Sequence, residues 1–251
     1  MIPEMLLVKQ SDKVMKLSDS FNKERELIHR QMMSSVSHDL KTPLASIIGS
    51  LEIHDQMKEQ LNPQKKQALL DTALEEAYRL DNFITNILDM AKLENGQVKV
   101  KNELCDIGSL LQDCRGHLSL RSKDSNVTIT PKSGILIVTT DATLLHRAIG
   151  LLLDNAVKYG RIPSIINIEY GMDDFSQCFI NIGDNGSGVP ESEIEAIFSK
   201  YTRFVKRDTQ NAGTGLGLAI CREIMRLLRG SVTVNNHPNG GAVFTLQFPA
   251  I

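Results

Sequence analysis

Three side chains that could do chemistry together lie within five residues of one another. His38, Asp39 and Thr42 belong to the stretch 37–44, whose sequence is SHDLKTPL. On a helix, His38 and Thr42 are four residues apart and share one face, while Asp39 can reach the imidazole from the side. Pro43 removes the backbone N–H that would bond to the Asp39 carbonyl, which loosens the helix there. A nucleophilic imidazole with a carboxylate to hold its tautomer indicates a phosphoryl-accepting site, but a surface histidine on a kinked helix fits the octapeptide equally well.

Two further polar segments lie more than a hundred residues downstream. Residues 154–159 (DNAVKY) end an apolar helical pattern, so Asn155 can offer an amide oxygen to Mg²⁺ and Lys158 can meet a phosphate from the same face. Residues 184–190 (DNGSGVP) follow a predicted strand, where Asp184 can accept a hydrogen bond from an exocyclic amine. Taken alone, a solvated helix end explains the first segment better, and the second is also typical of a polar turn.

A glycine-rich segment, residues 213–218 (GTGLGL), opens another predicted helix. Exposed N–H groups and the positive end of the helix dipole can bind an anion there. One such loop is weak evidence, since it lacks the preceding strand of a dinucleotide fingerprint and is not a Walker A loop. Residues 197–212, just before it, are rich in Lys, Arg and Asn and contain aromatic side chains. They predict a mobile basic lid, with an ordinary surface loop as the alternative.

Composition narrows the classes of protein to consider. The chain has 251 residues, which is long for one domain and comfortable for two. Its net charge of -2 gives no support for nucleic-acid binding. No window approaches the apolar run of about 18 residues that a membrane span needs. The four cysteines match no zinc spacing, so reduced thiols in a cytosolic protein are the simplest interpretation.

The first part of the chain has the pattern of a helical hairpin. Residues 55–63 are polar and contain Asn62-Pro63, a helix-stop and turn signal, between two helical stretches. The second stretch repeats apolar residues in steps of four and three, typical of a bundle seam: Ala73, Ala77, Leu80, Ile84, Ile87 and Ala91. Because one hairpin cannot bury both faces of such helices, we expect a dimeric four-helix bundle.

After Gly96, a plausible helix C-cap, the pattern changes to alternating strands and helices. Asp141 should cap a helix that continues through Ala156, and a second helix should follow the glycine-rich segment. The predicted strands are 127–130, 135–138, 165–170, 178–182, 231–235 and 242–248, with a hairpin turn at 239–241. We therefore expect an α+β domain with a mixed, partly antiparallel sheet and a helical layer.

Taken together and in this order, the segments resemble the transmitter of a two-component sensor histidine kinase. Residues 37–44 resemble the H box, 154–159 the N box, 184–188 the first G box, 198–204 the F box and 213–218 the second G box. Each box is a weak signal, but five in the correct order are specific. The resemblance covers residues 30–249, and residues 34–49 further resemble the potassium-responsive, osmosensitive subgroup.

The resemblance implies a fold and a domain organisation. A helical hairpin would form a dimeric four-helix bundle, followed by a Bergerat-type α/β sandwich that binds ATP. Residues 1–30 would be a signal-transmitting helical segment, 31–96 the dimerisation and phosphoacceptor hairpin, and 97–251 the catalytic domain. The expected location is the cytoplasm, either for the chain alone or for the cytoplasmic portion of a longer inner-membrane sensor.

The resemblance also implies a role for each matching residue. His38 would attack the γ-phosphorus of ATP, Asp39 would orient and deprotonate the imidazole, and Thr42 would position water to dephosphorylate a partner response regulator. Arg203 would stabilise charge on the transferring phosphoryl group. Asn155 would hold Mg²⁺, Lys158 would contact a phosphate, and Tyr159 would lie over the adenine. Asp184 would accept from the adenine amine, and Gly186 and Gly188 would let the base approach. The phosphates would be covered by the glycine-rich loop, which consists of Gly213, Thr214, Gly215, Leu216 and Gly217.

One position departs from the family pattern. The family usually has Asn four residues before the Mg²⁺-binding Asn, whereas this chain has Leu151, and related ATPases have a water-activating glutamate there. Leucine can do neither job, which argues against dedicated ATP hydrolysis. It predicts either weaker Mg²⁺ binding or a water molecule in place of the missing side chain. The expected function is an ATP-dependent protein histidine kinase, acting as a homodimer, that passes phosphate from His38 to an aspartate of a response regulator. The alternatives are a Bergerat-fold ATPase and a dimeric scaffold that only binds nucleotide.

Overall fold

The structure is a computed structural model that describes residues 37, 39–121, 125–132, 134–200, 215–238 and 240–250. The chain divides into two compact units, Met1–Ile84 and Thr85–Ile251. The division falls inside the long helix α2 (Pro63–Glu94), so the last turns of that helix belong to the second unit. Among the described residues, none of the helices has the length and hydropathy that crossing a bilayer would require.

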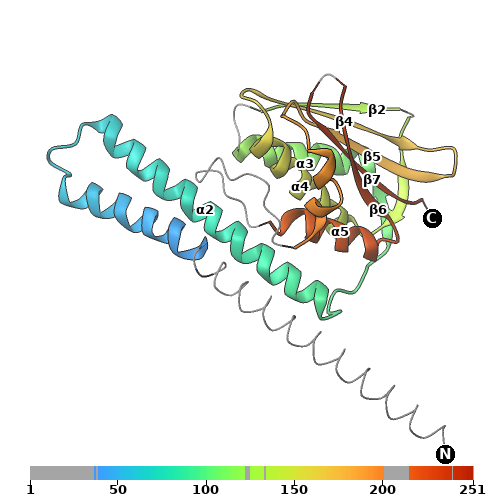
Figure 1. Cartoon of the computed structure of the whole chain (residues 1–251), viewed down its shortest axis with the longest axis horizontal. Helices are drawn as coiled ribbons and strands as arrows, with labels where there is room; N and C mark the ends of the chain where they lie inside the picture. The colour runs from blue at the N-terminus through green and yellow to red at the C-terminus, as the bar shows by residue number, and fades with distance from the viewer. Residues whose placement is uncertain are drawn as a thin grey trace, which may run out of the picture. The chain divides into compact units, whose positions relative to one another are not determined.

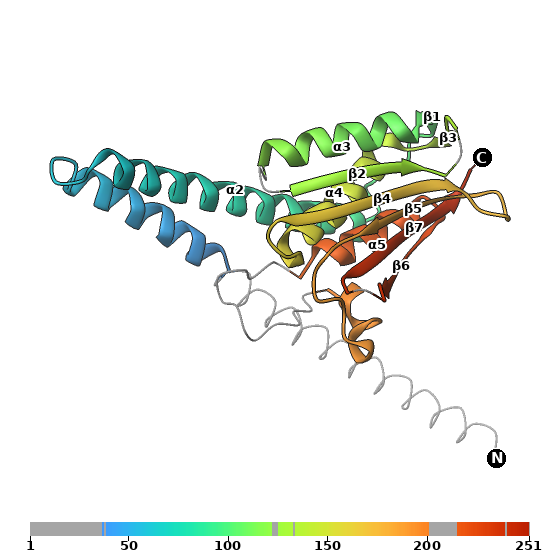
Figure 2. The same cartoon turned by 90° about the horizontal axis from the view of Figure 1, so that it is seen from above.

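The first unit contains a helical hairpin, as predicted. Helical residues 39–56 lead through a turn into α2, and the two helices lie side by side in both views (Figures 1 and 2). The side-chain oxygen of Asn62 accepts a hydrogen bond from the Lys65 N–H (2.8 Å), which caps α2. Pro63 occupies the first helical position, where its missing N–H costs nothing. The polar turn is therefore built by Asn62 and Pro63.

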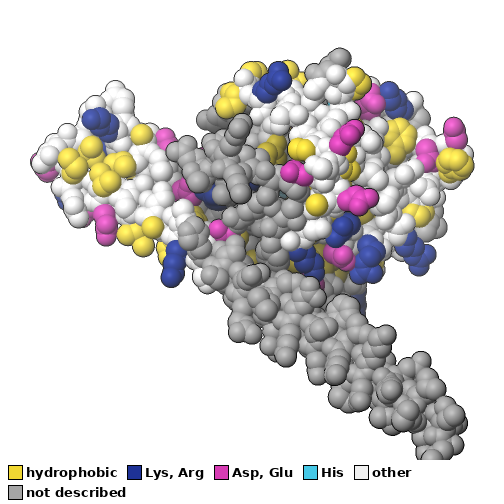
Figure 3. Space-filling model, viewed as in Figure 1, with side chains coloured by type: hydrophobic (Ala, Val, Ile, Leu, Met, Phe, Trp, Pro, Cys, Tyr) yellow, Lys and Arg dark blue, Asp and Glu magenta, His cyan; other side chains and the backbone are white. Residues whose placement is uncertain are grey.

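Helix α2 carries two apolar stripes rather than the single predicted seam. Ala73, Phe83 and Met90 are buried, whereas a neighbouring stripe is 41–54% exposed. The exposed stripe consists of Leu70, Leu74, Ile84 and Leu88. The predicted seam took members from both stripes, because two adjacent stripes on one helix share the spacing of four and three. Hydrophobic side chains also gather on the visible surface of the hairpin (Figure 3).

Gly96 ends α2 in the left-handed conformation, with φ of 62°. The Gln97 N–H bonds to the Lys92 carbonyl (3.0 Å) and the Gly96 N–H to the Leu93 carbonyl (3.2 Å). This pair of bonds is a Schellman motif, which satisfies carbonyls that the helix end leaves free. The predicted C-terminal glycine is confirmed.

The second unit is a five-stranded sheet covered on one face by helices (Figure 2). The strand order is β2-β4-β5-β7-β6; β2 runs parallel to β4, and all other neighbours are antiparallel. The strands are β2 (Ser125–Pro131), β4 (Ser164–Met172), β5 (Gln177–Gly183), β6 (Ser231–Asn236) and β7 (Ala242–Pro249). The helices are α3 (Ile107–Arg121), α4 (Ala142–Tyr159) and α5 (Gly217–Leu227). The expected mixed sheet with one helical layer is confirmed.

Two parts of this unit differ from the expectation. The predicted strand 135–138 begins at Ile137 as β3 (Ile137–Thr140), and it pairs with β1 (Glu103–Asp106) in a separate two-stranded sheet. Neither β1 nor α3 was predicted. Asp106 caps α3, since its Oδ1 accepts from the Gly108 N–H (2.9 Å). Glycine and serine in α3 weaken its helical signal, but its buried face packs into the core through Leu110, Leu111, Cys114 and Leu118.

Candidate functional site

Helix α4 positions the first predicted segment. Asp141 caps it, because its Oδ1 accepts from the Leu144 N–H (3.0 Å). Because the apolar face of α4 is buried in the core, Asn155 and Lys158 lie at the edge of that face near the end of the helix, where both are half-buried. The Lys158 ammonium lies 4.9 Å from the centroid of the Tyr159 ring, a cation–π distance. The helix end thus presents an amide, an ammonium group and a half-exposed aromatic ring together.

Asp184 follows β5, and one of its two carboxylate oxygens accepts hydrogen bonds from the backbone. Its Oδ1 accepts from the Gly186 N–H (2.8 Å) and the Ala242 N–H (3.2 Å), and its own N–H donates to the Ala242 carbonyl (2.9 Å). Among the described residues, none donates a hydrogen bond to Oδ2. One oxygen therefore fixes the loop, and the other is a hydrogen-bond acceptor to which no described residue donates.

The first two segments meet at Gly186. A Cβ atom there would come within 2.4 Å of the Tyr159 carbonyl oxygen, so only glycine fits. Asn185 adds a connection that sequence reasoning missed: its Oδ1 accepts from the N–H groups of Arg161 and Ile165 (3.2 Å each), and its Nδ2 donates to the Pro163 carbonyl (3.0 Å). The Asn-Gly pair in a polar loop is the signal that could have indicated this role.

The glycine-rich segment lies next to α4, the helix that ends in residues 154–159, and Leu151 of α4 is the residue that packs against it. Helix α5 begins at Gly217, four residues later than predicted, and a Cβ atom on Gly217 would lie 3.6 Å from Leu151 Cδ2. Leu151 is 6% exposed and belongs to the core between α4 and α5. Gly215 has φ of 65°, and Leu216 is fully buried. Gly213 and Thr214 lie outside the described residues.

The predicted lid begins with two residues that belong to the core. Ile197 and Phe198 are buried at the short helix Ala196–Phe198, and Phe198 packs edge to face on Phe244 with ring centroids 6.4 Å apart. A lid can therefore begin only after Phe198. Residues 201–214, including Arg203, lie outside the described residues.

The H-box residues lie in the first unit. Asp39 is half-buried and Thr42 is exposed on a helix that continues through the buried Pro43. His38 lies outside the described residues. The predicted kink at Pro43 stays a prediction, since the helix assignment is uninterrupted there.

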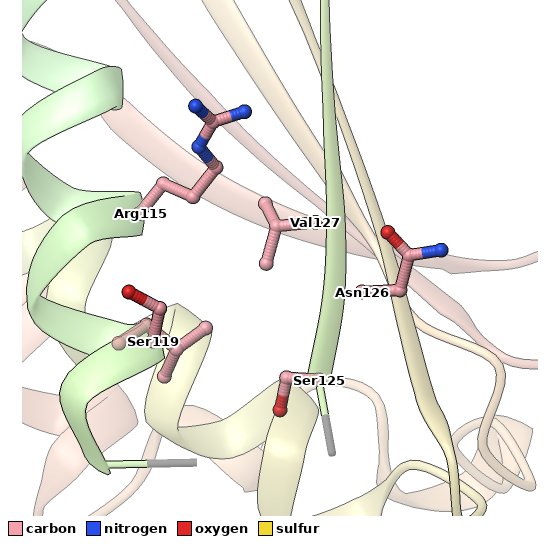
Figure 4. A pocket seen from close by; sticks show the side chains of 6 residues that line it. Arg115, Ser119, Ser125, Asn126 and Val127 are labelled. Carbon is pink, nitrogen blue, oxygen red and sulfur yellow. The ribbon is translucent and has the colours of Figure 1, made fainter. Parts of the chain in front are cut away.

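Other potential sites do not coincide with these residues. A pocket of about 230 Å³ between α3 and β2 contains none of the predicted site residues (Figure 4). Its lining is Arg115, Leu118, Ser119, Ser125, Asn126 and Val127. A second pocket, of about 370 Å³, lies beside Asp106 and Tyr170. All four cysteines are buried as free thiols, and burial raises the pKa of Cys114 to about 12, which favours the protonated thiol there.

Comparison with known proteins identifies the family. The "His Kinase A (phospho-acceptor) domain" family matches residues 28–96, and the "Histidine kinase-, DNA gyrase B-, and HSP90-like ATPase" family matches residues 140–251. The adaptive-response sensory kinase SasA of Synechocystis sp. is 32% identical over 263 residues, an alignment that covers 98% of this chain and 68% of SasA. This chain belongs to the histidine kinase family. The ATPase match makes ATP the nucleotide of this histidine kinase.

Other relatives extend the comparison. Sensor protein KdpD of Escherichia coli is 32% identical over 231 residues, covering 90% of this histidine kinase chain but only 25% of KdpD. Two solved structures share the fold of a hairpin followed by an α/β sandwich. The complex of histidine kinase ThkA with response regulator protein TrrA has a TM-score of 0.68 at 22% identity, covering 91% of this chain and 64% of that one. The Acinetobacter baumannii histidine kinase AdeS has a TM-score of 0.64 at 19% identity, covering 85% and 98%.

Proposed function

We propose that this histidine kinase transfers the γ-phosphoryl group of ATP to His38 and then to an aspartate of a response regulator. A bond forms between an imidazole nitrogen and the γ-phosphorus, while the bond from that phosphorus to the bridging oxygen breaks and ADP leaves with the electron pair. Asp39 orients the ring through its other nitrogen. Transfer to the regulator breaks the N–P bond and forms an acyl phosphate. Thr42 positions water for the later dephosphorylation.

The observation that carries the proposal is the junction of α4 with the Asp184 loop. Tyr159 and Gly186 are in backbone contact, and beside them Asp184 has an Oδ2 atom that receives no hydrogen bond from the described part of the chain. A carboxylate oxygen next to an aromatic ring and a glycine that permits close approach suits a purine with an exocyclic amine. Adenine would therefore lie at this junction, with Asp184 accepting from its amine and Tyr159 over its face. Gly188 permits the same close approach.

The phosphates would extend from this junction toward the start of α5. Lys158 would contact them, and the segment of Gly213, Thr214, Gly215, Leu216 and Gly217 would close over them. Arg203 would stabilise the charge on the moving phosphoryl group. Within the described part of the chain, no three His, Cys, Asp or Glu side chains gather into a metal site. Mg²⁺ would be held by the amide oxygen of Asn155 and by the nucleotide, where it would neutralise phosphate charge.

We also propose that the hairpin forms a homodimer. Leu70 and Leu74 are 41% and 54% exposed on the same face of α2, which is more apolar surface than an isolated hairpin can leave in water without cost. The variant Leu74→Glu should shift the chain from dimer to monomer in analytical ultracentrifugation. The control Leu104→Glu changes an 80% exposed leucine on β1 and should leave the dimer intact. A dimer that survives Leu74→Glu would place the interface elsewhere.

Three finer proposals concern the whole protein. The similarity to KdpD supports placing residues 34–49 in the potassium-responsive subgroup. Phosphotransfer rates to receiver domains from the KdpD and SasA systems would test this, with faster transfer to the former expected.

The domain bounds are 1–30, 31–96 and 97–251, and the location is cytoplasmic, whether or not a membrane sensor precedes this chain. This chain spans 25% of the length of the two KdpD relatives.

The variant Asp184→Asn tests the nucleotide site. Asparagine keeps an oxygen for the N–H groups of Gly186 and Ala242 but replaces Oδ2 with an amide that cannot accept from adenine. ADP affinity should fall about tenfold or more in a calorimetric titration, as expected for loss of a charge-assisted hydrogen bond. The control Asp174→Asn, in the turn between β4 and β5, should bind as the parent does. Unchanged affinity in Asp184→Asn would remove adenine from this junction. Steady phosphate release without a phosphoprotein would instead indicate an ATPase.

A further inference from the structure

One asparagine outside the predicted site binds both backbone groups of a single residue in the Asp184 loop. Asn236 is the last residue of β6. Its Oδ1 accepts from the Val189 N–H (2.7 Å), and its Nδ2 donates to the Val189 carbonyl (2.7 Å). Both distances are those of well-formed hydrogen bonds. A side-chain amide that pairs with a backbone N–H and C=O in this way takes the place of a neighbouring strand, so it fixes where Val189 lies.

Gly188 makes this pairing possible. Its φ is 76°, and a Cβ atom at this position would come within 2.6 Å of Asn236 Oδ1. Any other residue would push the asparagine away or require the loop to change its path. The second glycine of the first G box therefore has a structural use besides access for a ligand, because it admits the Asn236 side chain.

The two ends of the loop are held by one pair of facing residues. Asn236 pairs with Ala242 in the β6–β7 ladder. Ala242 accepts from the Asp184 N–H (2.9 Å) and donates to Asp184 Oδ1 (3.2 Å), while Asn236 holds Val189. Gly241 allows this approach, since a Cβ atom on it would come within 2.0 Å of the Asp184 carbonyl oxygen. The loop 184–189 is thus a bridge anchored at both ends on the end of one hairpin.

We propose that Asn236 is a positioning residue for the base of the bound nucleotide, an inference that rests on the proposed function. Its side-chain amide acts through the loop, to which it is bonded at Val189. By fixing the exit of the loop at Val189, it keeps Gly186 and Gly188 close to the base and Asp184 directed at the exocyclic amine. Its effect is therefore on recognition of adenine and not on the phosphates, which extend toward α5.

The experiment compares ADP with GDP, because guanine carries a carbonyl oxygen where adenine carries its amine. Calorimetric titrations of the full chain with each nucleotide and Mg²⁺ give the ratio of the two affinities. Asn236→Ala removes both bonds to Val189. Asn236→Asp keeps the shape and the acceptor but sets a carboxylate against the Val189 carbonyl. Asn235→Ala is the matched control, since Asn235 is exposed on the same strand and pairs with Val243.

The ratio of ADP to GDP affinity should fall about tenfold in Asn236→Ala, which loses both hydrogen bonds, and by a similar factor in Asn236→Asp, which loses one bond and gains repulsion from the Val189 carbonyl. It should stay at the parental value in Asn235→Ala. The rate of autophosphorylation at saturating ATP should stay within about twofold of the parent, since loss of binding that the ground state and the transition state share raises KM and leaves kcat unchanged. If Asn236→Ala does not fold, the affinity ratio of Asn236→Asp alone tests the proposal. An unchanged ratio, or an equal loss for both nucleotides, overturns the proposal. A parent chain that binds no ADP would instead contradict the proposed function.

Discussion

The carbonyl oxygen of Tyr159 lies 2.4 Å from the place where a Cβ atom on Gly186 would be, so the end of α4 and the Asp184 loop are in direct backbone contact. The same Cβ atom would come within 2.9 Å of Asp184 Oδ1. The Tyr159 oxygen belongs to the backbone, and the Asp184 oxygen is held by the N–H groups of Gly186 and Ala242, so neither can move away cheaply. This contact joins the two segments that are proposed to enclose adenine.

Gly186→Ala should therefore weaken ADP binding by at least about tenfold, because the loop must move away from α4 to accommodate the methyl group. Calorimetric titration measures the affinity, and circular dichroism checks that the second unit still folds. Gly116→Ala is the matched control: no described residue lies within 4 Å of a Cβ atom at that exposed position of α3, so binding should be unchanged. Parental affinity in Gly186→Ala would mean that the nucleotide does not use this contact.

Leu151→Asn should have two opposing effects. The leucine is buried against the first turn of α5, so placing an amide there should lower the free energy of unfolding by about 2–4 kcal/mol. The same amide, one helical turn before Asn155, adds an oxygen that Mg²⁺ can use. ADP binding should then reach half-saturation at a lower Mg²⁺ concentration than in the parent. Leu151→Met serves as the apolar control. An identical Mg²⁺ dependence in all three proteins would show that the residue at position 151 does not affect Mg²⁺ binding.

Thr42→Ala should spare the kinase and impair dephosphorylation of the regulator. Thr42 is exposed on the helix of residues 39–56, so its loss should change stability by about 0.5 kcal/mol or less. Autophosphorylation should stay within about twofold of the parent, while release of phosphate from a phosphorylated receiver domain should slow by at least about tenfold. Equal losses in the two assays would show that Thr42 serves the fold instead.

The His117–His146 pair should make the second unit less stable in mild acid. The two rings meet edge to face with centroids 5.2 Å apart. Burial, with the neighbouring His117 adding to it, lowers the pKa of His146 below its ordinary 6.5, and Asp113 partly opposes this. The folded state therefore binds fewer protons than the unfolded state, so stability is complete above pH 6.5 and declines as the pH falls below it.

Urea unfolding between pH 5 and 8 measures this dependence. His146→Gln should flatten the decline, whereas His237→Gln, at an exposed position after β6, should leave it as in the parent. A decline that persists unchanged in His146→Gln would assign it to other groups.

Local signals predicted most of the elements that carry the proposed site. Asp141 predicted the start of α4, and strands were predicted at the places of β4, β5 and β7, because there the local preference agrees with burial in the folded unit. Helix α3 was missed, since its stability comes from packing and not from its weak intrinsic helical preference. The pairing of β1 with β3 was missed for a similar reason, because two four-residue strands some thirty residues apart leave little local trace.

The parts of the site that sequence could not predict depend on distant contacts. Val189 and Asn236 are 47 residues apart, and nothing in the pattern of β6 distinguishes Asn236 from Asn235. The packing of Leu151 against α5 could not be predicted from the sequence either. From the sequence, the leucine at this position indicated only the loss of a polar side chain that could bind Mg²⁺. The structure shows that this leucine also supports the start of α5.

The most direct test of the account is incorporation of label from [γ-³²P]ATP into the full chain and into His38→Ala. The parent should acquire acid-labile, alkali-stable label, as a phosphohistidine does, and His38→Ala should acquire none while binding ADP with the parental affinity. His54→Ala, which changes a histidine within the helix of residues 39–56, should be labelled as the parent is. Acid-labile label that persists in His38→Ala, or is lost in His54→Ala instead, would contradict the assignment of His38 as the phosphoacceptor.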